Sequence, residues 1–212
     1  MSEDNIEKKG HGPPVAMKRP GTYIDIEDCK RLEDSCNDIR EKLLIAFMWR
    51  CGLRISEVIS LKKRDIHFDT GRIHVLHGGK DDKPKMGNMG VVSIPPLFLE
   101  YLKNVLHSLN DDDFIFPSRY RKQGYITRQR AWQIFRNVLK RSGLVYDKDG
   151  QPIHPHTLRH SFGVWLAKNG AKLDLIREQL RHKSLSTTTI YLRVASDEYE
   201  KEFKEIANKV GI

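Results

Sequence analysis

Apolar side chains recur at helical spacing along most of the chain and change to strand spacing in one short region. The first part predicts helices over residues 25–36, 38–51 and 53–61. Alternating and β-branched positions then predict strands over 65–68, 72–76 and 91–94, with a turn at 69–71 and a long polar loop over 77–90. Helical spacing returns over 96–109, 128–142, 155–169, 172–180, 186–193 and 197–210. We predict an α+β, mainly α fold with a small three-stranded antiparallel sheet.

The length of 212 residues fits one domain with tails better than two domains. Residues 1–21 are rich in glycine and proline, so we expect a flexible arm or linker there. The domain itself is expected over 22–195, and residues 196–212 are expected to form a C-terminal amphipathic helix or tail. The longest apolar run has seven residues, against roughly 20 for a membrane span. We therefore expect a cytoplasmic protein that does not enter a membrane.

Positive charge is concentrated in the second half of the chain. The formal net charge is +9, and residues 117–193 hold 16 Lys and Arg against 4 Asp and Glu. A segregated basic region is typical of a polyanion partner, and double-stranded DNA is the partner we expect. The alternative is a basic surface that only keeps the protein soluble. Cys29, Cys36 and Cys51 have no CxxC spacing, which argues against a disulfide framework or a thiolate zinc site.

A first candidate site lies where the second helix ends. Gly52 stops that helix, and Arg54 follows at the start of the next one. A guanidinium in this position can bind an anion through two donors, and Glu57 at i+3 can hold it in place. The alternative is a surface Arg–Glu pair worth a few tenths of a kcal/mol.

A second candidate site opens the helix expected at 155–169. With Pro155 at the helix start, His156 and Arg159 share a face of the first turn, where free backbone N–H groups also favour a phosphate. His160, one turn after His156, can orient it. His156 and His160 at i, i+4 could instead form a zinc pair, but the glutamate of an HExxH site is absent and no further ligand has a diagnostic spacing.

A third candidate site places His182 nine residues before Tyr191 in a basic, hydroxyl-rich stretch. Tyr191 is a possible nucleophile. A phenol has an ordinary pKa of about 10, so neighbouring positive charges would be needed to stabilise its phenolate during attack. The alternative is a tyrosine that only packs in the core.

Taken in order, these sites resemble the tyrosine recombinase (phage integrase, Xer-like) family over residues 22–195. The phrases that carry the resemblance are CGLRISEVISLKKRDIHFD and HPHTLRHSFGVWLAKNGAKLDLIREQLRHKSLSTTTIYLRV. The resemblance implies a helical catalytic domain of the DNA breaking and rejoining type. It also implies that no metal, cofactor or ATP is needed.

The resemblance further implies a role for each catalytic residue. Tyr191 would attack the scissile phosphorus, giving a 3′-phosphotyrosyl link and a free 5′-hydroxyl. Arg54, Arg159 and His182 would stabilise the charge on the phosphate oxygens. His156 would accept or relay the tyrosine proton. A lysine after the second strand would protonate the leaving oxygen; the family pattern favours Lys80, and Lys85 stays open because the loop is long.

Two groups of residues would support this chemistry. Glu57 and His160 are expected to hold the catalytic side chains in place. The basic side chains expected to contact DNA are Lys83, Lys85, Arg128, Arg130, Arg181 and Lys183.

The resemblance also bears on assembly. Complete recombinases of this family normally carry a core-binding domain before the catalytic one, so this sequence is expected to be a piece of a longer protein or a short member that works with a separate core-binding domain or accessory protein. We expect a homo-tetramer on DNA and a monomer or weak oligomer when free. The helix expected at 197–210 has an apolar stripe that would dock on a neighbouring protomer or pack on its own domain.

Two other functions compete with the recombinase hypothesis. Residues 162–180 also resemble a helix, tight turn and helix, as in a DNA-binding regulator without catalytic activity. An enzyme similar to type IB topoisomerases would share the tyrosine chemistry and relax supercoils without site preference.

Overall fold

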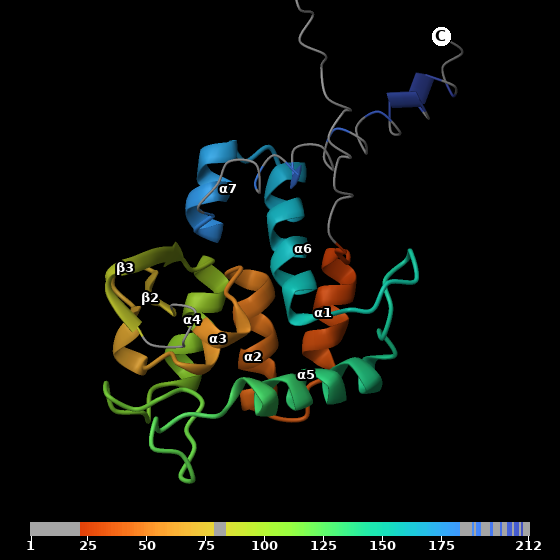
Figure 1. Ribbon diagram of the computed structural model, residues 1–212. Coiled ribbons are helices and arrows are strands. Elements are labelled where there is room, and N and C mark those ends of the chain that lie inside the picture. Colours follow the sequence, from red (N-terminus) through yellow and green to blue (C-terminus); the bar gives the residue numbers. More distant parts are fainter. Residues whose placement is uncertain are drawn as a thin grey trace, which may run out of the picture.

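The computed structural model describes residues 22–78 and 84–182, with the backbone alone over 76–78 and 84–89. Beyond residue 182 it describes Thr188, Ile190, Tyr191, Ser196, Glu200, Phe203, Lys204, Ile206, Ala207 and Lys209. Within these ranges the chain forms a mainly helical domain with a small antiparallel sheet at one side (Figure 1). The predicted fold class is confirmed.

The elements follow one another in the predicted order. Their bounds are α1 (Ile26–Asp34), α2 (Ile39–Arg50), α3 (Ile55–Ile59), η1 (Lys63–Asp65), β1 (Ile66–His67), β2 (Arg72–Gly78), β3 (Pro84–Ser93), α4 (Pro96–Val105), α5 (Arg128–Ser142), α6 (Pro155–Lys168) and α7 (Leu173–Leu180). The helix predicted over 96–109 ends earlier, at Val105. The helices predicted over 186–193 and 197–210 lie largely outside the described residues, although Ile190 and Tyr191 are helical.

Helix α2 lies at the centre of the core. Its residues 43–48 are all buried, because α1, α3, α5 and α6 each pack against it. Asp38 caps its start by accepting a hydrogen bond from the backbone N–H of Glu41. In Figure 1, α5 crosses below α1 and α2, while α6 stands beside α1. The core therefore brings α3 and α6, which carry two of the candidate sites, onto the same central helix.

The three strands pair in the order β1-β2-β3, all antiparallel. The prediction of a loop over 77–90 is wrong, because β2 continues to Gly78 and β3 already begins at Pro84. The register pairs Val75 with Gly90 and Gly78 with Pro84, with an irregularity between Leu76 and Gly78. Backbone groups can pair along a polar, glycine-rich stretch that has no apolar alternation, so the hydrophobic pattern missed this part of the hairpin.

Helix α7 is attached to the end of strand β3. The side-chain amide of Gln179 donates to the Ser93 carbonyl at 2.8 Å and accepts from the Ser93 N–H at 3.1 Å. Gly170, at φ +77°, makes the turn between α6 and α7. The sheet and α6 are thereby connected through α7. Within the described ranges, no helix is long and apolar enough to span a membrane.

Candidate active site

Arg54 precedes the first residue of α3, and the predicted pair with Glu57 is confirmed. Nη1 of Arg54 donates to Oε1 of Glu57 at 2.8 Å, and the Arg54 backbone N–H donates to Oε2 at 2.7 Å. The side chain of Arg54 is 37% exposed, whereas that of Glu57 is only 4% exposed. The carboxylate is therefore buried, and part of the guanidinium still faces solvent.

Arg181 reaches the same carboxylate from the end of α7. Its backbone is left-handed, at φ +51° and ψ +47°, and Nη2 donates to Oε2 of Glu57 at 2.6 Å. Only 5% of the side chain is exposed, and its Nε atom is buried without a hydrogen-bond partner in the described part of the chain. The guanidinium of Arg181, which we expected at a DNA-facing surface, is turned inward onto Glu57 in this structure, and its contact with DNA stays a prediction.

Arg159 is buried between three segments of the chain. Its Nη1 donates to the Gly52 carbonyl, its Nη2 donates to the Leu180 carbonyl, and Nη1 lies 4.0 Å from Oε2 of Glu57. Gly52 has φ +64°, and a Cβ there would lie 2.7 Å from the Phe162 ring. A glycine is thus required where the chain passes against α6, and Arg159 fastens that passage to the end of α7.

Arg54, Arg159 and Arg181 around Glu57 form what we call the guanidinium cluster. Burial alone would raise the pKa of Glu57, but the charge of Arg181, the backbone N–H of Arg54 and the charges of Arg54 and Arg159 bring it below its ordinary value. Burial, assisted by Arg54 and Arg181, lowers the pKa of Arg159 to about 9, so it stays charged at neutral pH. Three cations share one carboxylate, and the remaining positive charge favours an anion.

His156 opens onto a groove beside this cluster. The groove has a volume of about 790 Å³ and is lined by Arg54, Ile55, Ser56, Arg128, Gln129, Trp132, His154, Pro155 and His156. Loss of solvent around the ring and the charges of Arg159, Arg54 and Arg128 lower the pKa of His156. The imidazole is therefore neutral at pH 7. Arg54 and His156, predicted to act together, are brought to one groove.

Tyr191 packs against Gly163, on the face of α6 that also carries His156 and His160. The residue is fully buried, and its Oη atom lies 3.0 Å from Nδ1 of His160. A Cβ on Gly163 would come within 2.6 Å of the Tyr191 ring, so the ring rests directly on the backbone of α6. Burial raises the pKa of Tyr191 to about 12, against the opposing effect of Arg159 and Arg54. The phenol is fully protonated in this position.

His182 stacks on Tyr191 and completes what we call the phenol cluster, Tyr191 with His160 and His182. The centroids of the His182 and Tyr191 rings lie 5.9 Å apart at an interplanar angle of 13°, and Nδ1 of His182 lies 3.1 Å from Oγ1 of Thr188. Burial, with the charge of Arg159 next, lowers the pKa of His182 to about 4. Burial likewise lowers the pKa of His160 to about 4. Both rings are neutral at pH 7.

His160 contacts both His156 and Tyr191. Its ring centroid lies 5.8 Å from that of His156, and its Nδ1 lies 3.0 Å from Oη of Tyr191, so the expected role of orienting His156 stays a prediction. The pattern of residues misses this contact because Tyr191 follows His160 by 31 positions. The sequence pattern did not identify Gly163 as part of the site. The one available signal is that a glycine inside a helix lowers stability by about 0.5–1 kcal/mol relative to alanine, which suggests that a side chain would not fit there.

The remaining predicted residues fall into two groups. Arg128 and Arg130 are exposed at the start of α5, and Arg128 lines the groove. Lys80, Lys83 and Lys183 lie outside the described residues, and Lys85 belongs to strand β3, where the backbone alone is described. The assignment of the catalytic lysine therefore stays a prediction.

A metal centre has no ligand set in the described part of the chain. No group of three or more His, Cys, Asp or Glu side chains gathers there in a way that could hold a metal ion. Cys29 and Cys51 are buried and Cys36 is half-buried, all as free thiols. Burial raises the pKa of Cys29 and of Cys36 to about 12, so neither is a thiolate at neutral pH.

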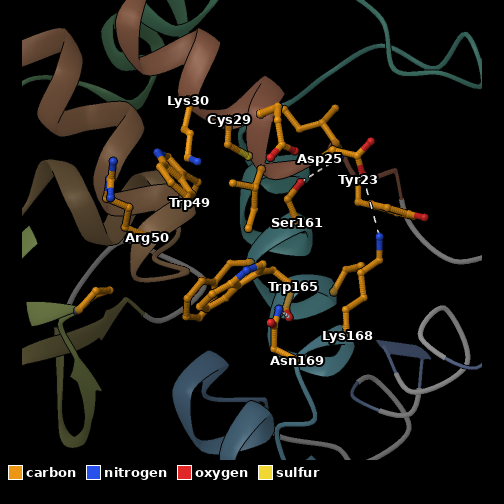
Figure 2. Close-up of a pocket in the computed structure, with 16 residues that line it drawn as sticks. Tyr23, Asp25, Cys29, Lys30, Trp49, Arg50, Ser161, Trp165, Lys168 and Asn169 are labelled. Atoms are coloured by element: carbon orange, nitrogen blue, oxygen red, sulfur yellow. Dashed lines mark hydrogen bonds and ion pairs between the residues drawn. The ribbon is translucent and has the colours of Figure 1, made fainter. Parts of the chain in front are cut away.

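A second pocket, separate from the groove, lies between the start of α1, the end of α2 and the second half of α6. It has a volume of about 520 Å³. Figure 2 shows Trp49 and Trp165 on its walls, with Tyr23 and Lys168 at one side. The Ile24 N–H donates to Oγ of Ser161 at 2.9 Å and holds the incoming chain at the pocket. We call it the tryptophan pocket.

Comparison with known proteins places this arrangement in a family. The profile described as the phage integrase family matches residues 23–198. The chain is 31% identical over 213 residues to tyrosine recombinase XerD of Listeria monocytogenes serotype 4b, covering 93% of this chain and 68% of the relative. It is 33% identical over 199 residues to tyrosine recombinase XerA of Pyrococcus furiosus, covering 92% of this chain and 65% of the relative.

Solved structures agree with the sequence matches. A crystal structure of XerA recombinase has a TM-score of 0.68 at 25% identity, covering 90% of this chain and 66% of that chain. XerH site-specific recombinase bound to a palindromic difH substrate has a TM-score of 0.63 at 25% identity, covering 87% of this chain and 53% of that chain. This chain thus spans between half and about two thirds of the length of these relatives. Because the family profile and the relatives cover most of its residues, the chain belongs to the phage integrase family and is a tyrosine recombinase.

Proposed function

We propose that this chain cuts and rejoins DNA strands, with Tyr191 as the nucleophile. Tyr191 attacks a backbone phosphorus, its Oη–P bond replaces the bond to the 5′ oxygen, and a 3′-phosphotyrosyl link and a 5′-hydroxyl result. A second 5′-hydroxyl reverses the step. The observation that carries the proposal is a continuous set of contacts: His182 stacks on Tyr191, and the His160 ring lies between those of Tyr191 and His156. His156 lines one groove with Arg54, and Arg159 lies 4.0 Å from the Glu57 carboxylate that binds Arg54. Each exchange conserves bond energy, so ATP is not required.

The guanidinium cluster supplies the electrostatic part of this chemistry. Arg54 faces the groove with a partly exposed guanidinium, and the buried Arg159 adds its charge near the same carboxylate. With His182 they stabilise the negative charge that grows on the non-bridging oxygens. Losing one such donor typically slows a reaction by about 10²–10³. Glu57 keeps the guanidiniums in place before DNA binds.

A lysine from the β2–β3 hairpin completes the proposed reaction. Its ammonium protonates the 5′ oxygen as that oxygen leaves. Lys80 is the first choice and Lys85 the second. The attachment of β3 to α7 through Gln179 supports a hairpin held close to Arg181 and His182. Cleavage rates of Lys80→Ala and Lys85→Ala separate the two.

Double-stranded DNA is the proposed partner. Residues 117–193 carry 16 basic against 4 acidic residues, and Arg128 and Arg130 are exposed at the start of α5, where Arg128 lines the groove. The XerH relative is bound to its difH substrate, which supports the same partner class here. Phosphate neutralisation makes such binding weaken as salt rises. The domain responsible is 22–195.

Assembly on DNA is proposed to be a homo-tetramer held by the C-terminal segment. Phe203 and Ile206 are 59% and 53% exposed, and residues 194–212 carry 5 acidic against 3 basic side chains. The tryptophan pocket has apolar walls that include Trp49 and Trp165, with both basic and acidic side chains around them, and these walls suit the exposed Phe203 and Ile206 of a second copy (Figure 2). Trp165→Glu should weaken assembly on DNA in light scattering while leaving the free chain folded. Unchanged assembly would contradict the docking.

The decisive experiment is recovery of a covalent protein–DNA adduct. The wild-type chain is incubated, with and without EDTA, with a pool of nicked DNA duplexes whose central sequence is randomised, so that cleavage traps the adduct. We expect an adduct with and without EDTA, none in Tyr191→Phe, and a normal amount in Tyr146→Phe, whose side chain is exposed. DNA binding with no adduct would favour a regulator, and relaxation of supercoils by a monomer would favour a topoisomerase-like enzyme.

A further inference from the structure

We propose that His160 is a catalytic residue that accepts the phenolic proton of Tyr191 as Tyr191 attacks phosphorus. This inference rests on the function proposed above and assigns the proton step to a residue other than His156. The observation behind it is the contact between Nδ1 of His160 and Oη of Tyr191, at 3.0 Å. The described residues give this hydroxyl one hydrogen-bond partner, and it is His160.

The surroundings of this pair restrict the route of the proton. Tyr191 is fully buried, on the side of α6 where Gly163 has no side chain. His156, the other histidine of this helix, lies at the groove with Arg54. Its ring meets that of His160, at a centroid distance of 5.8 Å, whereas the ring of His160 lies 5.7 Å from that of Tyr191. His160 therefore stands between the phenol and the groove.

Burial and the groups that face His160 keep its ring neutral. His156 and Arg159 face it from its own helix, Tyr191 from the segment after α7, and His182 through its position on Tyr191. Burial, then His156 and Arg159, lowers the pKa of His160 to about 4. A neutral ring with its proton on Nε2 leaves the Nδ1 lone pair free for the phenol.

The proton moves together with the new bond and not before it. At rest the pKa of Tyr191, about 12, lies far above that of His160, so the phenol keeps its proton. As the Oη–P bond forms, the phenolic oxygen loses electron density and becomes much more acidic, and its proton passes to Nδ1. The 5′ oxygen leaves with its bonding electron pair and takes a proton from the lysine. When the strands rejoin, His160 returns the proton to Tyr191.

Two substitutions separate proton transfer from hydrogen bonding. In His160→Asn the amide oxygen can occupy the place of Nδ1 and still accept the hydrogen bond, but it cannot take a proton at neutral pH. His160→Ala removes both functions. We expect both variants to form the adduct about 10²–10⁴ more slowly than wild type, the range of general base catalysis. His107→Asn, an exposed histidine after α4, is the control and should keep the wild-type rate.

A more acidic phenol provides the second readout. Replacing Tyr191 by 3,5-difluorotyrosine lowers the need for a base, so the penalty of His160→Asn should shrink by tenfold or more if His160 takes the proton. A role in packing predicts the same penalty with either phenol, and that result would overturn the proposal. Full activity of His160→Asn would also overturn it. If the wild-type chain forms no adduct, the proposed function itself fails, which is a different outcome.

If the His160 variants fold poorly, the contact can still be tested without them and without DNA. Imidazole nitrogen NMR of the wild-type chain should show His160 with its proton on Nε2 at neutral pH and an Nδ1 shift that changes in Tyr191→Phe. A proton on Nδ1 at neutral pH, or no change in Tyr191→Phe, would contradict the assigned contact.

Discussion

Two regions that share helix α6 treat polar groups in opposite ways. The guanidinium cluster keeps its groups charged, because one buried carboxylate and three backbone carbonyls hold three arginines. The phenol cluster keeps its groups neutral, because burial shifts the pKa values of His160, His182 and Tyr191 away from their charged forms. Fixed charge suits the stabilisation of a phosphate, and neutral groups suit a proton that must move. Along α6, less than two helical turns separate Arg159 of the guanidinium cluster from Gly163, on which Tyr191 of the phenol cluster packs.

The guanidinium cluster should depend most strongly on Glu57. We expect Glu57→Gln to lower the free energy of unfolding by about 3–5 kcal/mol, since two buried guanidiniums lose their counter-charge. The measurement is urea unfolding at neutral pH. Glu100→Gln, which removes an exposed ion pair with Lys103, is the matched control and should change stability by less than about 1 kcal/mol. Equal stability of the two variants would show that carbonyls alone hold the arginines.

The phenol cluster should respond to acid before the guanidinium cluster does. The pKa values of His160 and His182 are lowered to about 4, so between pH 6.5 and 4 the unfolded chain binds protons that the folded chain does not. Stability is therefore fully present above pH 6.5 and falls as the pH drops, by on the order of 3 kcal/mol at most for His160 and by less for the more exposed His182. The Glu57 carboxylate becomes protonated only below its ordinary pKa of 4.5, so the stability that it contributes is lost at lower pH.

The measurement for this prediction is urea unfolding at a series of pH values. His160→Asn should flatten the slope between pH 6.5 and 4, because one of the two rings no longer titrates. A wild-type slope in that variant would mean that His160 is accessible to protons in the folded chain.

Filling the space that the Tyr191 ring occupies should displace Tyr191 from the phenol cluster and leave the contacts of the guanidinium cluster in place. Gly163→Ala places a methyl group where the Tyr191 ring and Leu180 now lie, which costs about 1–3 kcal/mol by overpacking, less the gain of alanine in a helix. Tyr191 should shift toward solvent, and its pKa should fall from about 12 toward its ordinary value of 10. Ultraviolet titration against Tyr191→Phe gives this value, and an unchanged pKa would refute the close contact.

The smallest effect is expected at the link that joins both clusters to the sheet. Gln179→Ala removes two hydrogen bonds to Ser93 at an exposed edge, so we expect a loss of about 0.5–1.5 kcal/mol in unfolding free energy. The variant should also slow adduct formation, because the β2–β3 hairpin is no longer hydrogen-bonded to α7. An unchanged cleavage rate would show that this link does not contribute to catalysis.

Local patterns in the sequence were sufficient for most elements and for the contact between Arg54 and Glu57. The helices, the three-stranded sheet and the Arg54–Glu57 pair follow from spacing over a few positions, because they depend on neighbours one turn or one strand position away. The extended hairpin over residues 84–90 did not follow, because backbone pairing needs no apolar pattern.

Contacts between distant segments were decided only by the tertiary structure. The buried position of Arg181 on Glu57 joins residues 124 positions apart, and the contact of Tyr191 with His160 joins residues 31 positions apart. Both depend on how α7 and the following segment fold back onto α6, and no periodicity records that path. Whether a basic side chain meets DNA or a buried carboxylate, and which histidine faces the phenol, is set by burial, which exists only once the core has formed.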